Sequence, residues 1–581
     1  MSIKMKFSFQ HRAFYCYIGM SVWIFFLITD TTLYYTYIYY LISVVYKYIT
    51  VSDDPVAVKI ERNEYISKID AKYRKIFLRA CNPPETIVRV DSDTWLLQGV
   101  LVITRHGDRG PLTHLKVIQR LQVVDNLVIY NSHYEDFVLN ASSSGRAWWV
   151  AGPGPFHNFP SLPRTATTHC ALGQLTPKGL LQMITVGNIL REAYGDKLGL
   201  DGFLPNAPTS PSNCFHNMFS IEFTVSYVRV GGLAYSTRYR RTFQSLQALS
   251  WGGSRGAAAA REAHSVAFCF RHCACNAHHT LERASGDVMV ESEASRNRLE
   301  SHPAIKDLIK KLSKVLFESQ EYTDADVVRD ALLAYMCHDA PLPCSETNKK
   351  LYLDNVDNYD DVVIVKKNLD ADFNFPNDAR LDTDFDEEYR EPNTDVTEHF
   401  CIRKEHIMSV FAYLEWSYRQ DVKSVNNRRR SLLIAYGLIH NIVQNMIRMI
   451  SENKPKFVVY SGHDKTLQAL ILALGLNSYQ HYNIQYASRM IFEFTKRKAV
   501  AQDFYFRVVY NGEDVTNKIG FCKNRHSAME VVDPNDDMKT FNTYLCPIES
   551  IVRFIHDDYF AGFNVSNYKD ACATYGNGKH V

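Results

Sequence analysis

The chain has 581 residues, of which 46% are hydrophobic and 13% aromatic, a composition typical of a folded globular protein. Its 65 lysines and arginines nearly balance 63 aspartates and glutamates, which argues against a nucleic-acid partner because that class usually carries a strong positive charge. The length exceeds one ordinary domain, but an α/β core with an inserted cap would use it without several independent units.

The amino end carries an uncharged apolar run at residues 13–29, which Asp30 separates from a tyrosine-rich apolar run that ends near Tyr46. The first run is near the lower limit for crossing a bilayer, and tilt or part of the second run makes the length sufficient. Three basic residues and no acidic residue precede it, so the sequence predicts a type II signal anchor over residues 13–46. A cleaved signal peptide is the alternative, although no clear small-residue cleavage site follows the run.

A buried strand followed by clustered charge is predicted at residues 97–111, LQGVLVITRHGDRGP. Ligands of open α/β sheets bind at the carboxyl ends of strands, where this charge would lie. The guanidinium groups of Arg105 and Arg109 suit phosphate oxygens, and a neutral His106 between them could attack phosphorus. The stretch therefore indicates phosphoryl transfer through a phosphohistidine, with an exposed basic turn as the alternative.

Two further motifs follow in the amino-terminal half. Residues 112–210 read as cap loops, except that in GQLTPKGLLQ (173–182) Thr176 should cap a helix that starts at Pro177. The stretch STRYRRTFQS at residues 236–245 contains Arg241 and two further arginines, Arg238 and Arg240, which are expected to be solvated charges on a helix face. Residues 230–235 look like an insertion before it, and WGGSRGAAAA at residues 251–260 looks like a linker.

Cysteines form an even set once Cys16 in the predicted span is set aside, which favours disulfides in an oxidising lumen without fixing their pairing. A zinc site in FCFRHCACN (268–276), with His278 and His279 nearby, is the alternative, but its spacing fits no standard zinc finger. Two glycosylation sequons begin at Asn140 and Asn564. The twelve remaining cysteines are Cys81, Cys170, Cys214, Cys269, Cys273, Cys275, Cys337, Cys344, Cys401, Cys522, Cys546 and Cys572.

Helical sequence is predicted at residues 288–319 and again at 401–453. Between them, residues 355–396 are rich in Asp and Glu and read as a solvated acidic insertion, or alternatively as a binding segment for a basic partner. A second strand at Phe457 then ends in SGHD and passes into an apolar helix, which puts His463 and Asp464 at another strand end. The carboxyl end alternates as strands at 489–494 and 504–516 with Asn511-Gly512 as the turn signal, before a final helix that reaches Cys572.

Together these motifs resemble the histidine acid phosphatases, a branch of the phosphoglycerate-mutase-like fold. The signature R-H-G-x-R-x-P matches residues 105–111, the His-Asp element matches residues 463–464, and S-T-x-x-x-R-T matches residues 236–242. The resemblance implies that His106 is the nucleophile and Asp464 the general acid. It also implies that Arg105, Arg109, Arg241 and His463 bind the phosphate, with no metal and no cofactor.

The same resemblance implies the fold class and a domain layout. The fold would be α/β, with a mainly parallel sheet flanked by helices, an inserted and mostly helical cap, and an N-terminal transmembrane helix. The predicted core is about 81–111, 223–250 and 455–572, and the predicted cap is about 112–222 and 251–454. The remaining segments are a cytosolic tail (1–12), the anchor (13–46), a lumenal stem (47–80) and a carboxyl tail (573–581).

The MCHDAPLPC stretch at residues 336–344, the cysteine cluster and the anchor narrow the resemblance to the Golgi branch of the family. That branch would act on the 2-phosphate of xylose in the linkage region of proteoglycans. The implied partners are this phosphorylated glycan, the Golgi membrane and glycan-synthesis enzymes, with the catalytic domain in the lumen.

Three alternatives stay open. One is a broad-specificity acid phosphatase or phytase-like enzyme of the same fold. Another is a catalytically silent lumenal ectodomain that binds a partner. The presence of His106 and Asp464 argues against this second alternative. The third is a kinase-linked regulator, which the anchor and the lack of a convincing nucleotide-binding loop disfavour.

Overall fold

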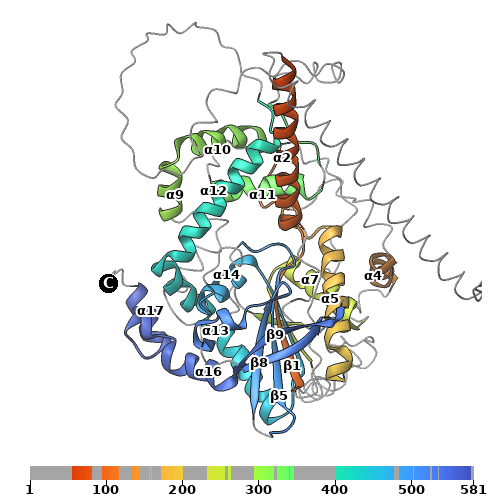
Figure 1. Cartoon of the computed structure of the whole chain (residues 1–581), viewed down its shortest axis with the longest axis vertical. Coiled ribbons are helices and arrows are strands. Elements are labelled where there is room, and N and C mark those ends of the chain that lie inside the picture. The colour runs from red at the N-terminus through yellow and green to blue at the C-terminus, as the bar shows by residue number, and fades with distance from the viewer. Residues whose placement is uncertain are drawn as a thin grey trace, which may run out of the picture. The chain divides into compact units, whose positions relative to one another are not determined.

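The chain divides into two compact units, Met1–Arg74 and Lys75–Val581, and the motifs above all lie in the second. Helix α2 (Pro55–Cys81) supplies the described residues of the first unit and lies within the predicted stem. The computed structural model (Figure 1) describes residues 55–81, 95–116, 132–143, 156, 159, 172–199, 232–254, 260–263, 293–318, 324–338, 340–345, 400–476, 483–500, 503–523, 527–533 and 536–576.

The described residues form a nine-stranded mixed sheet in the order β3-β2-β4-β1-β5-β6-β9-β8, with β7 beside β6. Strands β3, β2, β4 and β1 run parallel, and the strands from β5 onward pair antiparallel. The strands are β1 (Trp95–Arg105), β2 (Gly232–Thr237), β3 (Arg261–Ala263), β4 (Phe457–Gly462), β5 (Arg489–Arg497), β6 (Phe504–Tyr510), β7 (Glu513–Asp514), β8 (Ser527–Asp533) and β9 (Asp536–Pro547).

The prediction of a mainly parallel sheet is therefore wrong for the carboxyl-terminal half. Parallel neighbours need a crossover of a dozen or more residues, whereas β5 and β6 are joined by a short connection that permits only a hairpin. The predicted turn at Asn511-Gly512 is confirmed, because both residues have positive φ angles between β6 and β7.

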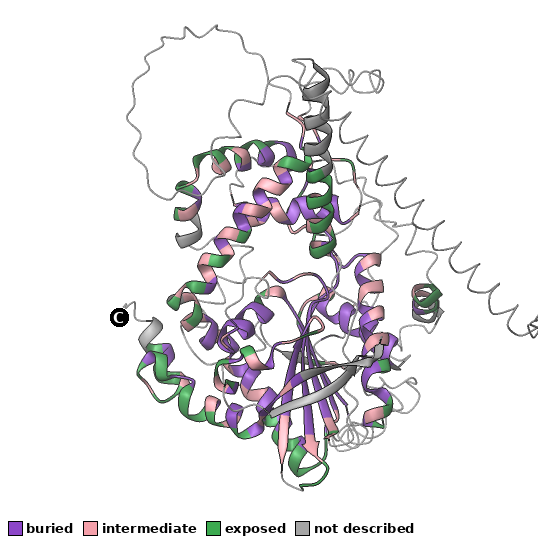
Figure 2. Ribbon diagram, viewed as in Figure 1, coloured by how far each residue is buried: buried purple, intermediate pink, exposed green. Residues whose placement is uncertain are grey.

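Helices cover both faces of the sheet because β1 alternates its apolar side chains between them (Figures 1 and 2). Val100 and Val102 pack with α4 (Ser132–Ser143), α5 (Pro177–Leu198) and α7 (Arg240–Ser254). Leu101 and Ile103 pack on the other side. The helices of that second face are α13 (Val425–Ser451), α14 (Asp464–Ala473), α16 (Ile548–Arg553) and α17 (Tyr568–Gly576).

A separate helical group is formed by α9 (Glu293–Glu300), α10 (Pro303–Leu316), α11 (Ala325–Met336) and α12 (Lys404–Lys423), which pack on one another. Within the described residues, α9 and α10 confirm the helical prediction for 288–319, and α12 and α13 confirm the one from Cys401 onward. The predicted cap is too large, however, because α5 and α13 belong to the layers on the sheet.

Two segments that the sequence suggested were inserted are instead core elements. Residues 232–235 lie in β2, which pairs with β4 in the middle of the parallel strands. Trp251 is buried in α7, and a Cβ atom on Gly252 would lie 2.1 Å from the carbonyl oxygen of Ile184 in α5. Glycine at this position lets two helix backbones touch. From the sequence alone, such a glycine-rich helix contact looks the same as a flexible linker.

The predicted disulfides are confirmed within the described part of the chain. Bonds join Cys81 to Cys337, Cys344 to Cys401 and Cys522 to Cys546. Cys572 is also disulfide-bonded.

Several other predictions fall outside the described residues: the anchor at 13–46, the cysteine cluster at 268–276 and the acidic insertion at 355–396. Among the described helices, none combines the length and apolar character needed to cross a bilayer. Asn140 lies in α4, and Asn564 is exposed just after a short 3-10 helix, η7 (Ala561–Phe563). Glycosylation of both stays a prediction.

Candidate active site

Three parallel strands end side by side and bring the two histidine motifs together. In the register of the sheet, Thr104 of β1 and Ser236 of β2 both pair with Ser461 of the central strand β4. The residues that follow these positions therefore lie together at the carboxyl ends of the three strands. His106 and His463 meet there, with ring centroids 5.6 Å apart.

The loop after β1 is held by close backbone contacts. A Cβ atom on Gly107 would lie 2.2 Å from the carbonyl oxygen of Gly179 in α5, so only glycine fits. The Gly107 amide donates to Ser245 Oγ of α7 at 3.1 Å. Thr176 caps α5 as predicted, with Pro177 in the first turn, and its hydroxyl accepts from the Gly179 amide. The start of α5 thus fixes the path of the loop that carries His106.

His106 is 2% exposed, and its Nδ1 lies 2.8 Å from the carbonyl oxygen of Gly107. A carbonyl can only accept, so Nδ1 carries the proton and donates it, which leaves the Nε2 lone pair free. Burial, followed by the positive charge of Arg241 and Arg105, holds the pKa of His106 well below its usual value. The structure therefore keeps this imidazole neutral and nucleophilic at one nitrogen.

His463 is oriented by a chain of hydroxyl groups. Its Nε2 lies 2.9 Å from Thr237 Oγ1, which in turn donates to Thr242 Oγ1 at 2.9 Å. The Thr242 hydroxyl donates to backbone carbonyls, so the protons run from Nε2 outward. Nδ1 then faces Arg241 Nη2 at 3.4 Å as an acceptor. Burial and Arg241 lower the pKa of His463 well below its usual value.

Three arginines surround the histidine pair, and each has a buried Nε with no hydrogen-bond partner: Arg105, Arg109 and Arg241. Arg105 donates to the Ile484 carbonyl oxygen at 2.8 Å and lies 4.3 Å above the ring of Tyr486. Burial and the charge of Arg109 lower the pKa of Arg241 to about 10. The described side chains therefore leave buried positive charge and three N–H donors unsatisfied, as expected of a site for an anion.

Asp464 occupies the first turn of α14 and is ion-paired with Arg105, with Nη2 and Oδ2 3.2 Å apart. The N-cap residue of α14 is His463, and Asp464 is the first residue of the helix. Burial would raise the pKa of Asp464, but Arg105 and other nearby cations outweigh it and hold the value well below the usual range. Its side chain is 35% exposed, which leaves the carboxylate open to a ligand.

All six residues predicted for the site lie close together at the carboxyl ends of the parallel strands, although their catalytic roles stay predictions. Sequence reasoning missed Asp330, Tyr486 and Thr237, which support the arginines and His463. Of these three residues, only Asp330 gave a signal in the sequence, because it is a charged residue within the largely apolar helix ADVVRDALLAYM. Among the described residues, no group of three or more His, Cys, Asp or Glu side chains is placed to hold a metal ion.

The parallel strand ends, the histidine pair and the arginines define a class of phosphate-handling enzymes, and comparison with known families agrees. The sequence model of the histidine phosphatase superfamily (branch 2) matches residues 96–511. The chain belongs to this superfamily, and it is a phosphoric monoester hydrolase.

Among curated proteins, the chain is similar to 2-phosphoxylose phosphatase 1. The Xenopus tropicalis protein is 23% identical over 492 residues, covering 82% of this chain and 77% of the relative. The Homo sapiens protein is 24% identical over 489 residues, covering 82% and 81%.

The comparison with solved structures matches a phytase from D. castellii and a Bifidobacterium longum multiple inositol polyphosphate phosphatase in complex with phosphate. The first has a TM-score of 0.38 and 12% identity, covering 87% of this chain and 91% of the other. The second has a TM-score of 0.41 and 10% identity, covering 83% and 98%.

The charge of Arg241 should set the acid limb of the pH profile. Arg241→Ala removes a cation that disfavours the protonated form of His106, so the pKa of His106 should rise toward 6.5 and the fall in kcat/KM should begin at a higher pH than in the wild type. The kcat/KM at the pH optimum should also fall by about a hundredfold, which is the usual effect of losing one hydrogen-bond donor to an oxyanion.

The pH dependence of kcat/KM with one aryl phosphate measures this shift, because ionisation of the substrate is then common to both proteins. Arg240→Ala is the matched control, since Arg240 is exposed on the same helix. An acid limb that stays in place in Arg241→Ala would contradict the assignment of that limb to His106.

Proposed function

We propose that the protein removes the 2-phosphate of xylose in the glycosaminoglycan linkage region, through a phosphohistidine formed on His106. The observation that carries the phosphoryl-transfer chemistry is a set of three guanidinium groups around a neutral histidine, each with a buried Nε atom that has no partner among the described residues. Similarity to 2-phosphoxylose phosphatase 1 over 82% of the chain supports the choice of substrate.

In the first step, Arg105, Arg109 and Arg241 hold the phosphate oxygens. His463 joins them by gaining a proton on Nδ1, because the negative charge of the bound phosphate favours the protonated imidazole. His106 Nε2 attacks phosphorus, which forms a P–N bond while the bond from phosphorus to the sugar oxygen breaks. The arginines offset the negative charge on the oxygens of the transition state. Asp464 gives its proton to the departing sugar oxygen, because an alkoxide is a poor leaving group.

Asp464 must gain that proton although Arg105 holds it ionised in the free protein. A bound phosphate competes for the same guanidinium and brings negative charge beside the carboxylate. Both changes favour the protonated acid, so substrate binding itself prepares Asp464 for the reaction. In the second step, water attacks phosphorus, its proton passes to Asp464, and the P–N bond breaks to release inorganic phosphate and neutral His106.

We further propose that the protein is a single-pass type II protein of the Golgi membrane with its catalytic domain in the lumen. The uncharged runs at residues 13–46 and the basic residues before them support the anchor and its orientation. The disulfides in the described residues support an oxidising compartment.

A secreted form covering residues 48–581 should release phosphate from an oligosaccharide of the linkage region that contains xylose 2-phosphate. His106→Ala should abolish the release, because no other described histidine presents a free nitrogen at this point in the site. Phosphate release over time measures both.

Hydrolysis of phenyl phosphate without action on the linkage oligosaccharide would contradict the glycan substrate and leave the phosphatase chemistry intact. A folded protein inert toward both would favour a binding role in the lumen.

Asp464→Asn should slow hydrolysis of sugar phosphates far more than that of aryl phosphates. A phenolate leaves without protonation and a sugar alkoxide does not, so the loss in kcat should exceed a hundredfold for the sugar ester and be about tenfold or less for the aryl ester. Single-turnover rates on the two esters give the comparison. Equal losses on both would show that Asp464 is not the general acid.

A further inference from the structure

Helix α11 contacts the loop after β1 at two points. At the first, Asp330 forms a two-point ion pair with Arg109: Nη2 lies 2.9 Å from Oδ1 and Nη1 lies 3.2 Å from Oδ2. The Leu112 amide also donates to Asp330 Oδ2 at 2.9 Å. Arg109 and Asp330 are 5% and 7% exposed, so one buried carboxylate fixes both an arginine and the backbone three residues beyond it.

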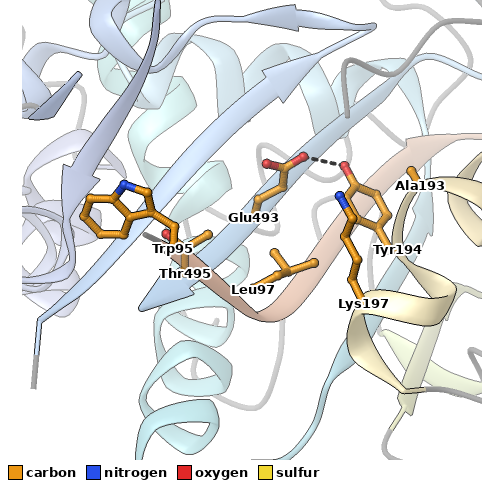
Figure 3. A pocket seen from close by; sticks show the side chains of 7 residues that line it. All are labelled: Trp95, Leu97, Ala193, Tyr194, Lys197, Glu493 and Thr495. Atoms are coloured by element: carbon orange, nitrogen blue, oxygen red, sulfur yellow. Dashed lines mark hydrogen bonds between the residues drawn. The ribbon is translucent and has the colours of Figure 1, made fainter. Parts of the chain in front are cut away.

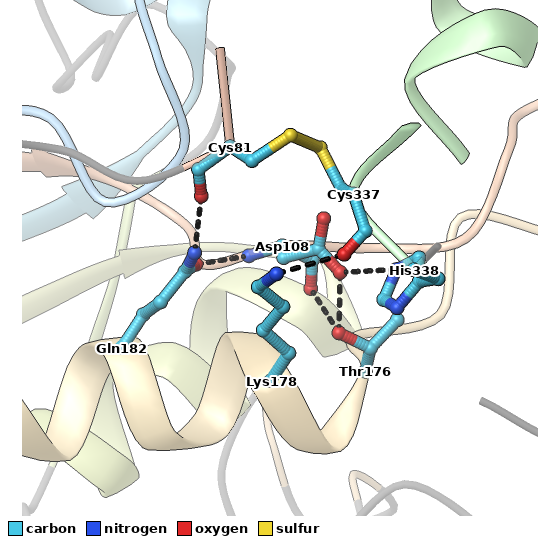
Figure 4. The surroundings of a disulfide bond; sticks show 7 residues. All are labelled: Cys81, Asp108, Thr176, Lys178, Gln182, Cys337 and His338. Atoms are coloured by element: carbon cyan, nitrogen blue, oxygen red, sulfur yellow. Dashed lines mark hydrogen bonds and ion pairs between the residues drawn. A yellow bond between two sulfur atoms is a disulfide. The ribbon is translucent and has the colours of Figure 1, made fainter. Parts of the chain in front are cut away.

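The second contact lies just beyond the end of α11. His338 Nε2 lies 2.8 Å from Asp108 Oδ2, and Thr176 Oγ1 donates to the same oxygen at 2.5 Å (Figure 4). Burial raises the pKa of Asp108, but His338 and Thr176 outweigh it and lower the value overall. Asp108 stands between Gly107 and Arg109, so this contact holds the centre of the same loop.

A disulfide closes the network around this second contact (Figure 4). Cys337, next to His338, is bonded to Cys81, and its carbonyl oxygen accepts from Lys178 Nζ at 2.7 Å. The Cys81 carbonyl accepts from Gln182 Nε2 at 2.7 Å, while Gln182 Oε1 accepts from the Asp108 amide at 2.9 Å. The end of α11 is therefore tied to the loop through side-chain, backbone and covalent links.

The ion pair also decides which atoms of Arg109 face the site. Nη1 is used by Asp330 and by the carbonyl oxygen of Gly110, and Nη2 is used by Asp330. The Nε of Arg109 is buried with no partner. The contacts with Asp330 and Gly110 thus leave two of the five N–H donors, the one on Nε and the second one on Nη2, for an anion.

We propose that Asp330 and His338 are positioning residues that hold Arg109 and Asp108 in place, so that phosphate binding in the core depends on helix α11. This inference rests on the proposed phosphatase function and adds to it residues that touch no substrate atom. A purely structural ion pair would affect only stability, because removing one partner leaves an unpaired buried charge that destabilises the fold.

The test uses the full chain in detergent and inorganic phosphate as the probe. Asp330→Asn keeps the shape of the side chain and removes its charge. The dissociation constant for phosphate, measured by calorimetry, and the KM for an aryl phosphate should both rise about tenfold or more, with a smaller change in kcat, because a well-placed charged donor is lost from substrate and transition state alike. Asp330→Glu should recover part of the affinity.

Glu493→Gln is the matched control, because it breaks an equally buried ion pair away from the site. Glu493 is 4% exposed, pairs with Arg507 at 2.7 Å and accepts from Tyr194 beside a small pocket on the sheet (Figure 3). This variant should lower the thermal unfolding midpoint without changing phosphate affinity. Unfolding midpoints of all variants separate lost stability from lost positioning.

Should Asp330→Asn fail to fold, His338→Ala and His338→Gln form a second pair. The glutamine amide can still donate to Asp108, so His338→Gln should keep most of the phosphate affinity that His338→Ala loses. Unchanged or tighter phosphate binding in Asp330→Asn, or an equal loss in Glu493→Gln, would overturn the inference while the wild type still hydrolyses phosphate esters. A wild type that neither binds phosphate nor hydrolyses the ester would instead overturn the proposed function, and this inference with it.

Discussion

Buried positive charge that two carboxylates balance only in part is the feature on which the rest of the site depends. Three guanidinium groups approach one another at the carboxyl ends of the parallel strands, where mutual repulsion and burial both oppose them. Two come from the end of β1 and the loop after it, and the third comes from α7. The fold offsets this cost with fixed partners for the outer nitrogens: the Ile484 carbonyl for Arg105 and the Asp330 carboxylate for Arg109. Burial and the same positive charge lower the pKa of His106 and keep it unprotonated, so the arginines serve both anion binding and nucleophilicity.

The parallel half of the sheet provides the rigid frame for this charge. Strands β1, β4 and β2 are buried on both faces, and their common register sends His106, His463 and Thr237 to one edge. The helices contribute the fine adjustment. Helix α5 limits the loop by direct backbone contact, α7 supplies Ser245 and Arg241, and α11 holds Arg109 from outside the core. Different elements therefore hold the three arginines in position, and no single segment contains all the residues of the site.

The sequence predicted the parts of the site that are local. Two short motifs each predict a strand and the reactive residues directly after it: a β-branched run before RHGDRGP, and a second run before SGHD. The family signature links the two motifs. The parts that depend on distant contacts were not predictable in this way. The glycines at 252 and 253 looked flexible because their helix partner α5 lies far away in the chain, and β2 looked inserted because only its pairing with β4 identifies it. Asp330 gave a local signal, but nothing in the sequence named Arg109 as its partner.

The most direct measurement is detection of phosphate on His106 during turnover. The full chain is mixed with an aryl phosphate and quenched within milliseconds in alkali, in which phosphohistidine survives, and the peptide that contains residues 105–111 is examined by mass spectrometry. Neutral, buried His106 among three arginines predicts one phosphate on that histidine early in the reaction, lost again when the sample is quenched in acid. Steady hydrolysis with an unmodified His106 at every quench time, or phosphate on a different residue, would contradict the central claim.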